Sequence, residues 1–527
     1  MTPAHPGPVS GSAPSSRALT ARRALLVAVP LGIIGDPLLR NGPWGLGLLV
    51  WMAVFAAAVV FVVARCGRAL SRESVVWLAV AVLFAGGLSW HDADMLQAFD
   101  VLAMLGALVL LAMSLDAIPV ASLARARVRD LMQAAFGTGL EVATGAVPLL
   151  FRDAEAHSAI DPSSDGKARR IGHALAITLP ILLVFALLLA NADPLFASLF
   201  NFPDIQFDVL VSHVVVAGFF AWVVAGWMRR SLLARPAADA PALTFPLKLG
   251  ATDVTLAFGA LSVLFAAFVV VQLGWLFGGQ ALVLSTTGLT YAEYARRGFF
   301  ELMGVAGLLL PLLLGAQALI PDADTRTLKF YRRLAALLLV LLGAIMVSAG
   351  ARMKLYVHYY GISTDRLYAS AFMVWLAIVF VWLAVTVLRS RPRAFATGLV
   401  VSGFGVLFTL NLLNPDALVA RANLARSDLA QGGVAGSDLQ YVAHLGGDAM
   451  PLVVSALTAG PIPADSAGAA DRCAAAKIVL DRWTGERRET MGSSWTRWNL
   501  ARSRGTAVVR AHEAELRRLE CPTAEGP

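Results

Sequence analysis

Charged residues are scarce in this chain: they make up 15% of it, whereas hydrophobic residues make up 58%. The mean hydropathy is correspondingly high, at +0.69. A water-soluble protein of 527 residues needs far more polar surface than this composition provides. The scarcity of charge therefore excludes a soluble globular protein and indicates a protein that resides in a membrane.

The chain also lacks the short motifs that accompany common cofactor chemistry. It contains no Walker P-loop, no G-x-G-x-x-G after a strand, no H-E-x-x-H, no paired C-x-x-C and no G-x-S-x-G elbow. Nucleotide or zinc chemistry of the soluble type therefore has no support in the sequence, and we expect neither a cofactor nor a metal.

Long apolar runs are what the chain has instead. A helix needs roughly 20 apolar residues to cross a hydrocarbon core about 30 Å thick, and in lipid its backbone groups must be satisfied internally. The clear runs are 45–64, 75–90, 97–114, 171–191, 206–228, 253–277, 298–320, 333–350, 368–388 and 395–411. An earlier run, 24–34, is short and extends only by accepting Asp36 and Pro37, and we interpret the stretch 131–150 as interfacial. The fold class predicted is all-α, a polytopic transmembrane helix bundle of about eleven spans.

Lysine and arginine gather at alternate ends of these runs, as the positive-inside rule requires of cytoplasmic segments. The basic segments are the N-terminus, 65–74, 115–170, 229–250, 321–333 and 389–394. We therefore expect a disordered cytoplasmic N-terminus at 1–23, a transmembrane helical domain at 24–411 and an extracytoplasmic helical domain at 412–527. Thirteen basic and thirteen acidic residues cancel in 412–527, so the net charge of +8 lies in the membrane part. This charge sets topology and predicts no nucleic-acid partner.

The sequence of the C-terminal region predicts short amphipathic helices, because apolar residues recur there at helical spacing. The expected helices are 414–429, 437–458, 466–485 and 493–520. Cys473 and Cys521 both lie in this region, and an oxidising compartment outside the membrane would let them pair. Two unpaired buried thiols are an equal alternative.

Two outer loops carry basic residues against the topology rule, at 287–301 and 349–368. Their cations and tyrosines predict a pocket for an anionic or lipidic ligand, since arginine suits bidentate capture of such groups. The alternative is an aromatic belt with snorkelling cations at the membrane interface. The candidate ligand-binding residues are Tyr291, Tyr294, Arg297, Glu301, Arg352, Lys354, Tyr356, Tyr360 and Arg366.

Acidic residues form a further set on the outer loops, which includes Asp36, Asp92, Asp94, Asp193 and Asp204. Such a residue could serve a lipid-linked transferase as a base, although a loop aspartate is more often a turn former or a helix cap. Inside the spans ionisable residues are few, Asp100 lying near the end of one. A proton relay normally requires more acidic residues near the middle of the membrane, so the sequence disfavours a proton-coupled pump.

Several stretches together resemble one family of bacterial multi-pass proteins, domain of unknown function 4173, which is similar to domain 4153. They are ADPLF, YAEYARRGFFELMGVAGLLLPLLL, RMKLYVHYYGISTDRLYASAFMVWLA and NPDALVARANLAR. The resemblance covers roughly 170–460 and implies fold and location but no reaction. The family pattern falls on Tyr294, Arg297, Glu301, Arg352, Tyr360, Arg366, Tyr368, Asn414 and Arg421.

We therefore expect an integral protein of the bacterial cytoplasmic membrane, with a non-enzymatic role preferred over an enzymatic one. Its role would be that of a scaffold, sensor or transporter-like protein whose outer face binds an anionic or lipidic ligand. The alternative is a membrane transferase acting on a lipid-linked substrate at the outer face. The partners expected are membrane lipids, an anionic or lipid-linked ligand, and an envelope protein that would bind through 412–527.

Overall fold

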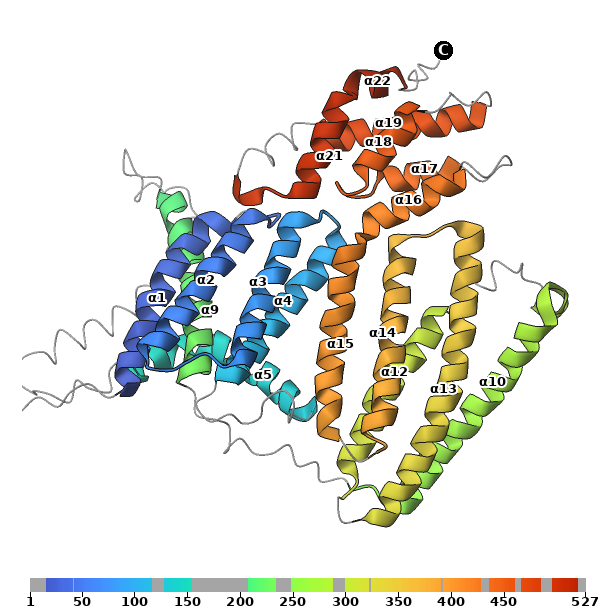
Figure 1. The fold of residues 1–527 in the computed structure, drawn as a ribbon, viewed down its shortest axis with the longest axis horizontal. Helices are drawn as coiled ribbons and strands as arrows, with labels where there is room; N and C mark the ends of the chain where they lie inside the picture. Colours follow the sequence, from blue (N-terminus) through green and yellow to red (C-terminus); the bar gives the residue numbers. More distant parts are fainter. Residues whose placement is uncertain are drawn as a thin grey trace, which may run out of the picture. The chain divides into compact units, whose positions relative to one another are not determined.

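The architecture is that of a computed structural model, in which every described regular element is a helix (Figure 1). The described residues are 16–40, 42–115, 128–153, 207–233, 248–287, 299–321, 324–389, 392–427, 436–459, 466–484 and 495–519. They divide into two compact units. Unit 1 comprises 1–86, 104–120 and 132–238, and unit 2 comprises 87–103, 121–131 and 239–527.

Ten helices among the described residues are long and apolar enough to cross a membrane, or up to 11 if a bent pair counts as one span. This confirms the predicted all-α polytopic bundle. They are α1 (Ser16–Leu39), α2 (Leu46–Arg65), α3 (Arg72–Trp90), α4 (Asp94–Leu115), α9 (Phe207–Leu232), α10 (Ala251–Thr287), α12 (Phe299–Leu319), α13 (Thr325–Tyr360), α14 (Thr364–Thr386) and α15 (Pro392–Leu413). The run predicted at 171–191 lies outside the described residues.

Helix α1 differs from the short first run that the sequence indicated. It is 24 residues long, begins at Ser16 and continues through Pro30 and Pro37. Within unit 1 it packs against α9, where a Cβ on Gly32 would clash with the backbone of Ala217. Small residues of this kind allow membrane helices to approach closely. The span is therefore longer than the apolar run because the helix also takes in residues from the basic N-terminal segment.

The stretch predicted to be interfacial forms two helical pieces. Helix α5 (Val128–Thr144) is followed by α6 (Ala146–Pro148) and the π-helical turn η2 (Leu149–Asp153). The two halves are bent by 59° at the break. They form either a broken span or a re-entrant segment.

In unit 2 the membrane helices share an aliphatic core. Tyr331, Leu338 and Leu342 of α13 are fully buried, as is Leu383 of α14. The hydroxyl of Tyr331 donates a hydrogen bond of 2.8 Å to the carbonyl of Leu313 in α12. Burying a tyrosine with its hydroxyl paired in this way avoids the cost of an unsatisfied polar group. The core thereby ties α12, α13 and α14 together.

The C-terminal region of unit 2 is helical, as predicted. It contains α16 (Pro415–Ser427), α17 (Gly436–Ala443), α18 (Met450–Ala459), α19 (Ser466–Trp483), η4 (Trp495–Arg497), α21 (Leu500–Ala511) and α22 (Glu513–Arg518), which we call the C-terminal helices. Their core surrounds Trp483, whose side chain is completely buried. The helix predicted over 437–458 is interrupted at 444–449, where two glycines occur.

Candidate functional site: a polar junction

The short loop between α3 and α4 carries two buried polar residues, His91 and Asp92. The Asp92 carboxylate accepts hydrogen bonds from Nε and Nη2 of Arg502, at 3.0 and 2.5 Å. Its second oxygen accepts one from the backbone N–H of Gly447, at 3.1 Å. Both nitrogens donate to Oδ1 of Asp92. Arg502 lies on α21, so this charge-assisted pair attaches a C-terminal helix to a loop between two membrane helices.

Asp448 is the second carboxylate of this region and faces the same loop. It accepts hydrogen bonds from the backbone N–H of Asp92 at 2.7 Å and from Nδ2 of Asn414 at 2.8 Å. Nδ1 of His91 lies 3.1 Å from its Oδ1 atom. Asn414 follows directly after α15, so Asp448 connects the ends of three membrane helices.

Asn499 joins the C-terminal end of α3 to the start of α21. Its Nδ2 donates to the carbonyls of Leu88 and His91, at 2.8 and 2.7 Å. Its Oδ1 accepts from the N–H of Arg502 at 2.9 Å, which makes it the N-cap of α21. A single amide thus hydrogen-bonds to backbone groups at two helix termini.

Two glycines, Gly446 and Gly447, allow their segment to lie close to the α3–α4 loop and to α21. A Cβ on Gly446 would clash with the carbonyl of Asp92, and one on Gly447 would lie 2.5 Å from the carbonyl of Ala501. The N–H of Gly446 donates to Asp416 on α16, at 2.8 Å. Burial raises the pKa of Asp416 to about 6, and the Gly446 hydrogen bond only partly opposes this shift.

The C-terminal helices also hold the loop between α13 and α14. The side-chain amide of Asn423 donates to the carbonyl of Ile362 at 2.7 Å and accepts from its N–H at 2.9 Å. The hydroxyl of Tyr441 accepts from the N–H of Thr364 at 2.9 Å. We call these contacts, together with those of His91, Asp92, Asp448, Asn499 and Arg502, the polar junction.

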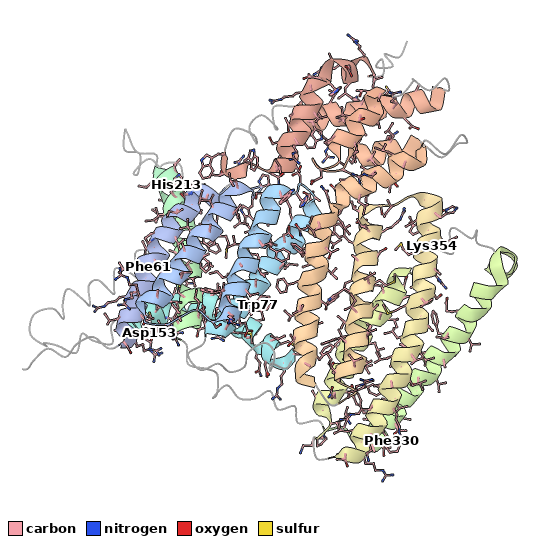
Figure 2. The ribbon with its side chains drawn as sticks, viewed as in Figure 1. Phe61, Trp77, Asp153, His213, Phe330 and Lys354 are labelled. Atoms are coloured by element: carbon pink, nitrogen blue, oxygen red, sulfur yellow. The ribbon has the colours of Figure 1, made fainter. Side chains whose placement is uncertain are left out.

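Part of the predicted ligand-binding set comes together at the same α13–α14 turn. The Arg366 guanidinium lies 4.0 Å from the ring centroid of Tyr356, and the Tyr356 and Tyr360 rings are 5.2 Å apart. Arg366 also donates to the carbonyls of Tyr360 and Gly361, at 3.0 and 2.5 Å. Lys354 is exposed and lies toward the same end of α13, with Phe330 near the other end (Figure 2).

Other members of the predicted set are placed differently. Arg352 is buried and donates to the side-chain oxygen of Gln272 in α10, at 2.7 Å, where Ser348 also donates. It therefore serves contact between spans, since a buried guanidinium in a membrane needs polar partners. Glu301 is exposed in the first turn of α12. Tyr291, Tyr294 and Arg297 lie outside the described residues.

Two of the acids predicted on the outer loops, Asp36 and Asp92, form ion pairs, and Asp36 lies within α1 and not in a loop. In unit 1, Asp36 forms an ion pair with Arg40 at 2.6 Å and contacts His213. At the opposite end of α9, Arg229 pairs with Asp153 and Glu141, at 2.8 and 2.5 Å (Figure 2). Asp92 belongs to the polar junction and Asp94 is exposed, while Asp193 and Asp204 lie outside the described residues. Asp36 and Asp92 therefore both act as ion-pair partners.

Most of the polar junction could not be recognised in the sequence. Asp92 and Arg502 are 410 residues apart, and nothing in either neighbourhood identifies the other. Two features of the sequence pointed to this region. Gly446-Gly447-Asp448 indicates a turn within a helical pattern, and Asn414 belongs to the family pattern. Among the described residues, no group of three or more His, Cys, Asp or Glu side chains could hold a metal ion.

Comparison with known proteins identifies a family. Residues 78–456 match the family described as Domain of unknown function (DUF4153). The matched region includes the α3–α4 loop, the α13–α14 turn and Asp448, whereas Asn499 and Arg502 lie beyond it. No curated protein and no solved structure matches the chain. The match covers more than half of the sequence, so the chain is a multi-pass helical membrane protein that belongs to the DUF4153 family.

Proposed function

We propose that this protein is a non-enzymatic membrane receptor or scaffold that binds an anionic lipid headgroup beside the α13–α14 turn. The protein would lie in the bacterial cytoplasmic membrane, with the N-terminus inside and the C-terminal helices outside. The headgroup would meet Lys354 and Arg366, with Tyr356 and Tyr360 at its edge. Cations beside a membrane surface attract anionic lipids, and arginine forms paired hydrogen bonds to phosphate.

One observation carries the proposal: the C-terminal helices hold the turn that joins the two cation-bearing helices. Asn423 pairs with both backbone groups of Ile362, only four residues from Arg366. A ligand at Arg366 would therefore alter a segment that is fixed to α16. This coupling is what a sensor or a scaffold for an envelope protein partner requires, because a ligand acts by favouring one of two arrangements.

The lipid site can be tested by native mass spectrometry of the purified protein with phosphatidylglycerol and phosphatidylcholine. A basic residue near an anionic surface is worth about 1 kcal/mol, so each lost cation should lower phosphatidylglycerol retention roughly fivefold. We expect this decrease in Lys354→Ala and a larger one in Lys354→Ala/Arg366→Ala. Phosphatidylcholine retention should not change in either variant.

The matched control removes the same charge from the exposed side of the C-terminal helices. Lys477 and Arg504 are both exposed, so Lys477→Ala/Arg504→Ala should retain phosphatidylglycerol as the wild type does. Because Arg366 also supports the turn, the single variant Lys354→Ala keeps the test valid if the double variant is unstable. Equal retention in Lys354→Ala and in the control would refute the proposed site.

A further inference from the structure

Asp100 is the most deeply placed acid of the described membrane helices in unit 2. Its side chain is completely buried, although its position near the start of α4 suggested a residue at a span end. At 1.5 Å per residue it lies about 9 Å along the helix axis from Asp94 and about 22 Å from Leu115. It is therefore inside the bundle but closer to the end of α4 that bears the polar junction.

Three helices enclose this carboxyl group. Asn411 of α15 donates from Nδ2 to Oδ1 of Asp100 at 2.7 Å. Gly87 of α3 lies directly against Oδ2, where a Cβ would clash with that oxygen and would lie 2.9 Å from Oδ1 of Asn411. Only a glycine leaves room at this position for the Asp100 side chain. Helices α3, α4 and α15 thus form a fitted site around one acid and one amide.

The second oxygen of this acid has no hydrogen-bond partner among the described residues. Oδ2 of Asp100 is buried, and no arginine or lysine of the described part forms an ion pair with the carboxyl. The titratable groups facing the region are His91, which lies one turn beyond Gly87, and Tyr368 of α14. Asp416 and Asp448 lie farther out, and their charges also reach the Tyr368 hydroxyl. A carboxylate here would have one amide donor, and the His91 ring already contacts Asp448.

An ionised carboxylate in such a place is costly, because low-dielectric surroundings do not replace its hydration and no arginine or lysine of the described residues pairs with it. A protonated carboxyl avoids this cost. Its O–H can also donate a hydrogen bond, and Oδ1 of Asn411 borders the same space beside Gly87. The site is therefore suited to the neutral acid.

We propose that Asp100 is an intramembrane proton-binding site, protonated on Oδ2 at neutral pH, which exchanges its proton with the compartment on the side of the polar junction. Release breaks the O–H bond, leaves the carboxylate hydrogen-bonded to Asn411, and passes the proton to water on that side. The inference does not depend on lipid binding at Lys354 or Arg366. It adds a proton to the ligands that this protein takes.

Infrared difference spectroscopy of the full-length protein in proteoliposomes tests the first part. We expect a C=O stretching band of a buried protonated carboxyl at pH 7 that is lost in Asp100→Asn. The band should persist in the control Asp94→Asn, because Asp94 is an exposed acid in the first turn of the same helix. Asparagine is nearly isosteric with the neutral acid, so Asp100→Asn should fold and keep the wild-type unfolding temperature at pH 7.

The two ways in which this test can fail are distinct. A band that remains in Asp100→Asn belongs to another acid and overturns the proposal, as does a wild-type protein without such a band. If Asp100→Asn does not fold, Asn411→Leu replaces it: removing the amide donor should shift the band to higher frequency without abolishing it. A band unmoved by Asn411→Leu would also overturn the assignment.

The direction of proton exchange is tested by changing pH on one side of the proteoliposome at a time. The Asp100 band should diminish when the side bearing the C-terminal helices is made alkaline. It should not respond when only the opposite side is changed. A response to the opposite side alone would overturn the proposed exchange route.

Discussion

Individual carboxyl groups in and beside the polar junction differ in how their burial is compensated. Asp92 has a guanidinium at 2.5 Å and Asp448 has two N–H donors, so hydrogen bonds compensate the burial of both side chains. Asp416 is buried with one backbone donor and with three acids near it, and its pKa is raised accordingly. Residue type alone does not distinguish these cases, because the distinction depends on donors from distant parts of the chain.

The raised pKa of Asp416 predicts a pH dependence of stability. The pKa in the folded state is about 6, against 3.8 for the free side chain, so the folded state binds more protons between these values. Its contribution to stability is thus complete below about pH 4 and is lost as the pH rises through 6, by about 2–3 kcal/mol. Asp416→Asn should remove this dependence and raise the free energy of unfolding at pH 7 by about that amount.

Thermal unfolding of the two proteins between pH 4 and pH 7 checks this prediction. The control is Asp481→Asn, since Asp481 is an exposed acid of α19. That variant should show the same pH dependence as the wild type. A loss of stability in Asp416→Asn at pH 7 would contradict the prediction.

At the level of elements, the helices could be predicted from the sequence far better than their contacts. Apolar runs identify spans because the hydrocarbon core fixes their length, and caps such as Ser363 follow from local chemistry. The partner of Arg352 was not predictable, because Gln272 is one of many polar residues that could face it. The polar junction depends on side chains up to 410 residues apart, which only the fold brings together.

The turn between α13 and α14 is a case in which a single residue of the sequence, Gly361, predicts the local structure. Gly361 ends α13 with φ 73° and ψ −179°, a conformation essentially restricted to glycine. We expect Gly361→Ala to lower the free energy of unfolding by about 1–3 kcal/mol. It should also loosen the contact of Asn423 with Ile362.

A second glycine of the same helix serves as the control for this variant. Gly343 lies within α13, and a Cβ there would meet nothing within 4 Å. Gly343→Ala should be neutral or stabilising by up to about 1 kcal/mol, because alanine loses less backbone entropy in a helix. The measurements are thermal unfolding in detergent and hydrogen exchange at residues 361–364. Equal effects of both substitutions would show that the turn conformation is not decisive.

At the scale of the whole molecule, the hydrogen bonds of unit 2 place the ends of several membrane helices on the same side as the C-terminal helices. The C-terminal helices contact the α3–α4 loop, the α13–α14 turn and the end of α15. These three positions are the ones that the distribution of basic residues places outside. Cys473 is disulfide-bonded, which is in keeping with an oxidising compartment, and Cys66 is a free thiol; Cys521 lies outside the described residues.

The orientation can be measured with a membrane-impermeant maleimide on spheroplasts. Cys66 follows α2 beside Arg65 and near Arg68, a basic flank that the positive-inside rule assigns to the cytoplasm. In Cys66→Ser proteins, an added Ser503→Cys on α21 should be labelled in intact spheroplasts. An added Thr325→Cys at the start of α13 should be labelled only after permeabilisation, although both positions are exposed. The reverse pattern would place the C-terminal helices in the cytoplasm and would contradict both the proposed orientation and a lipid site on the outer face.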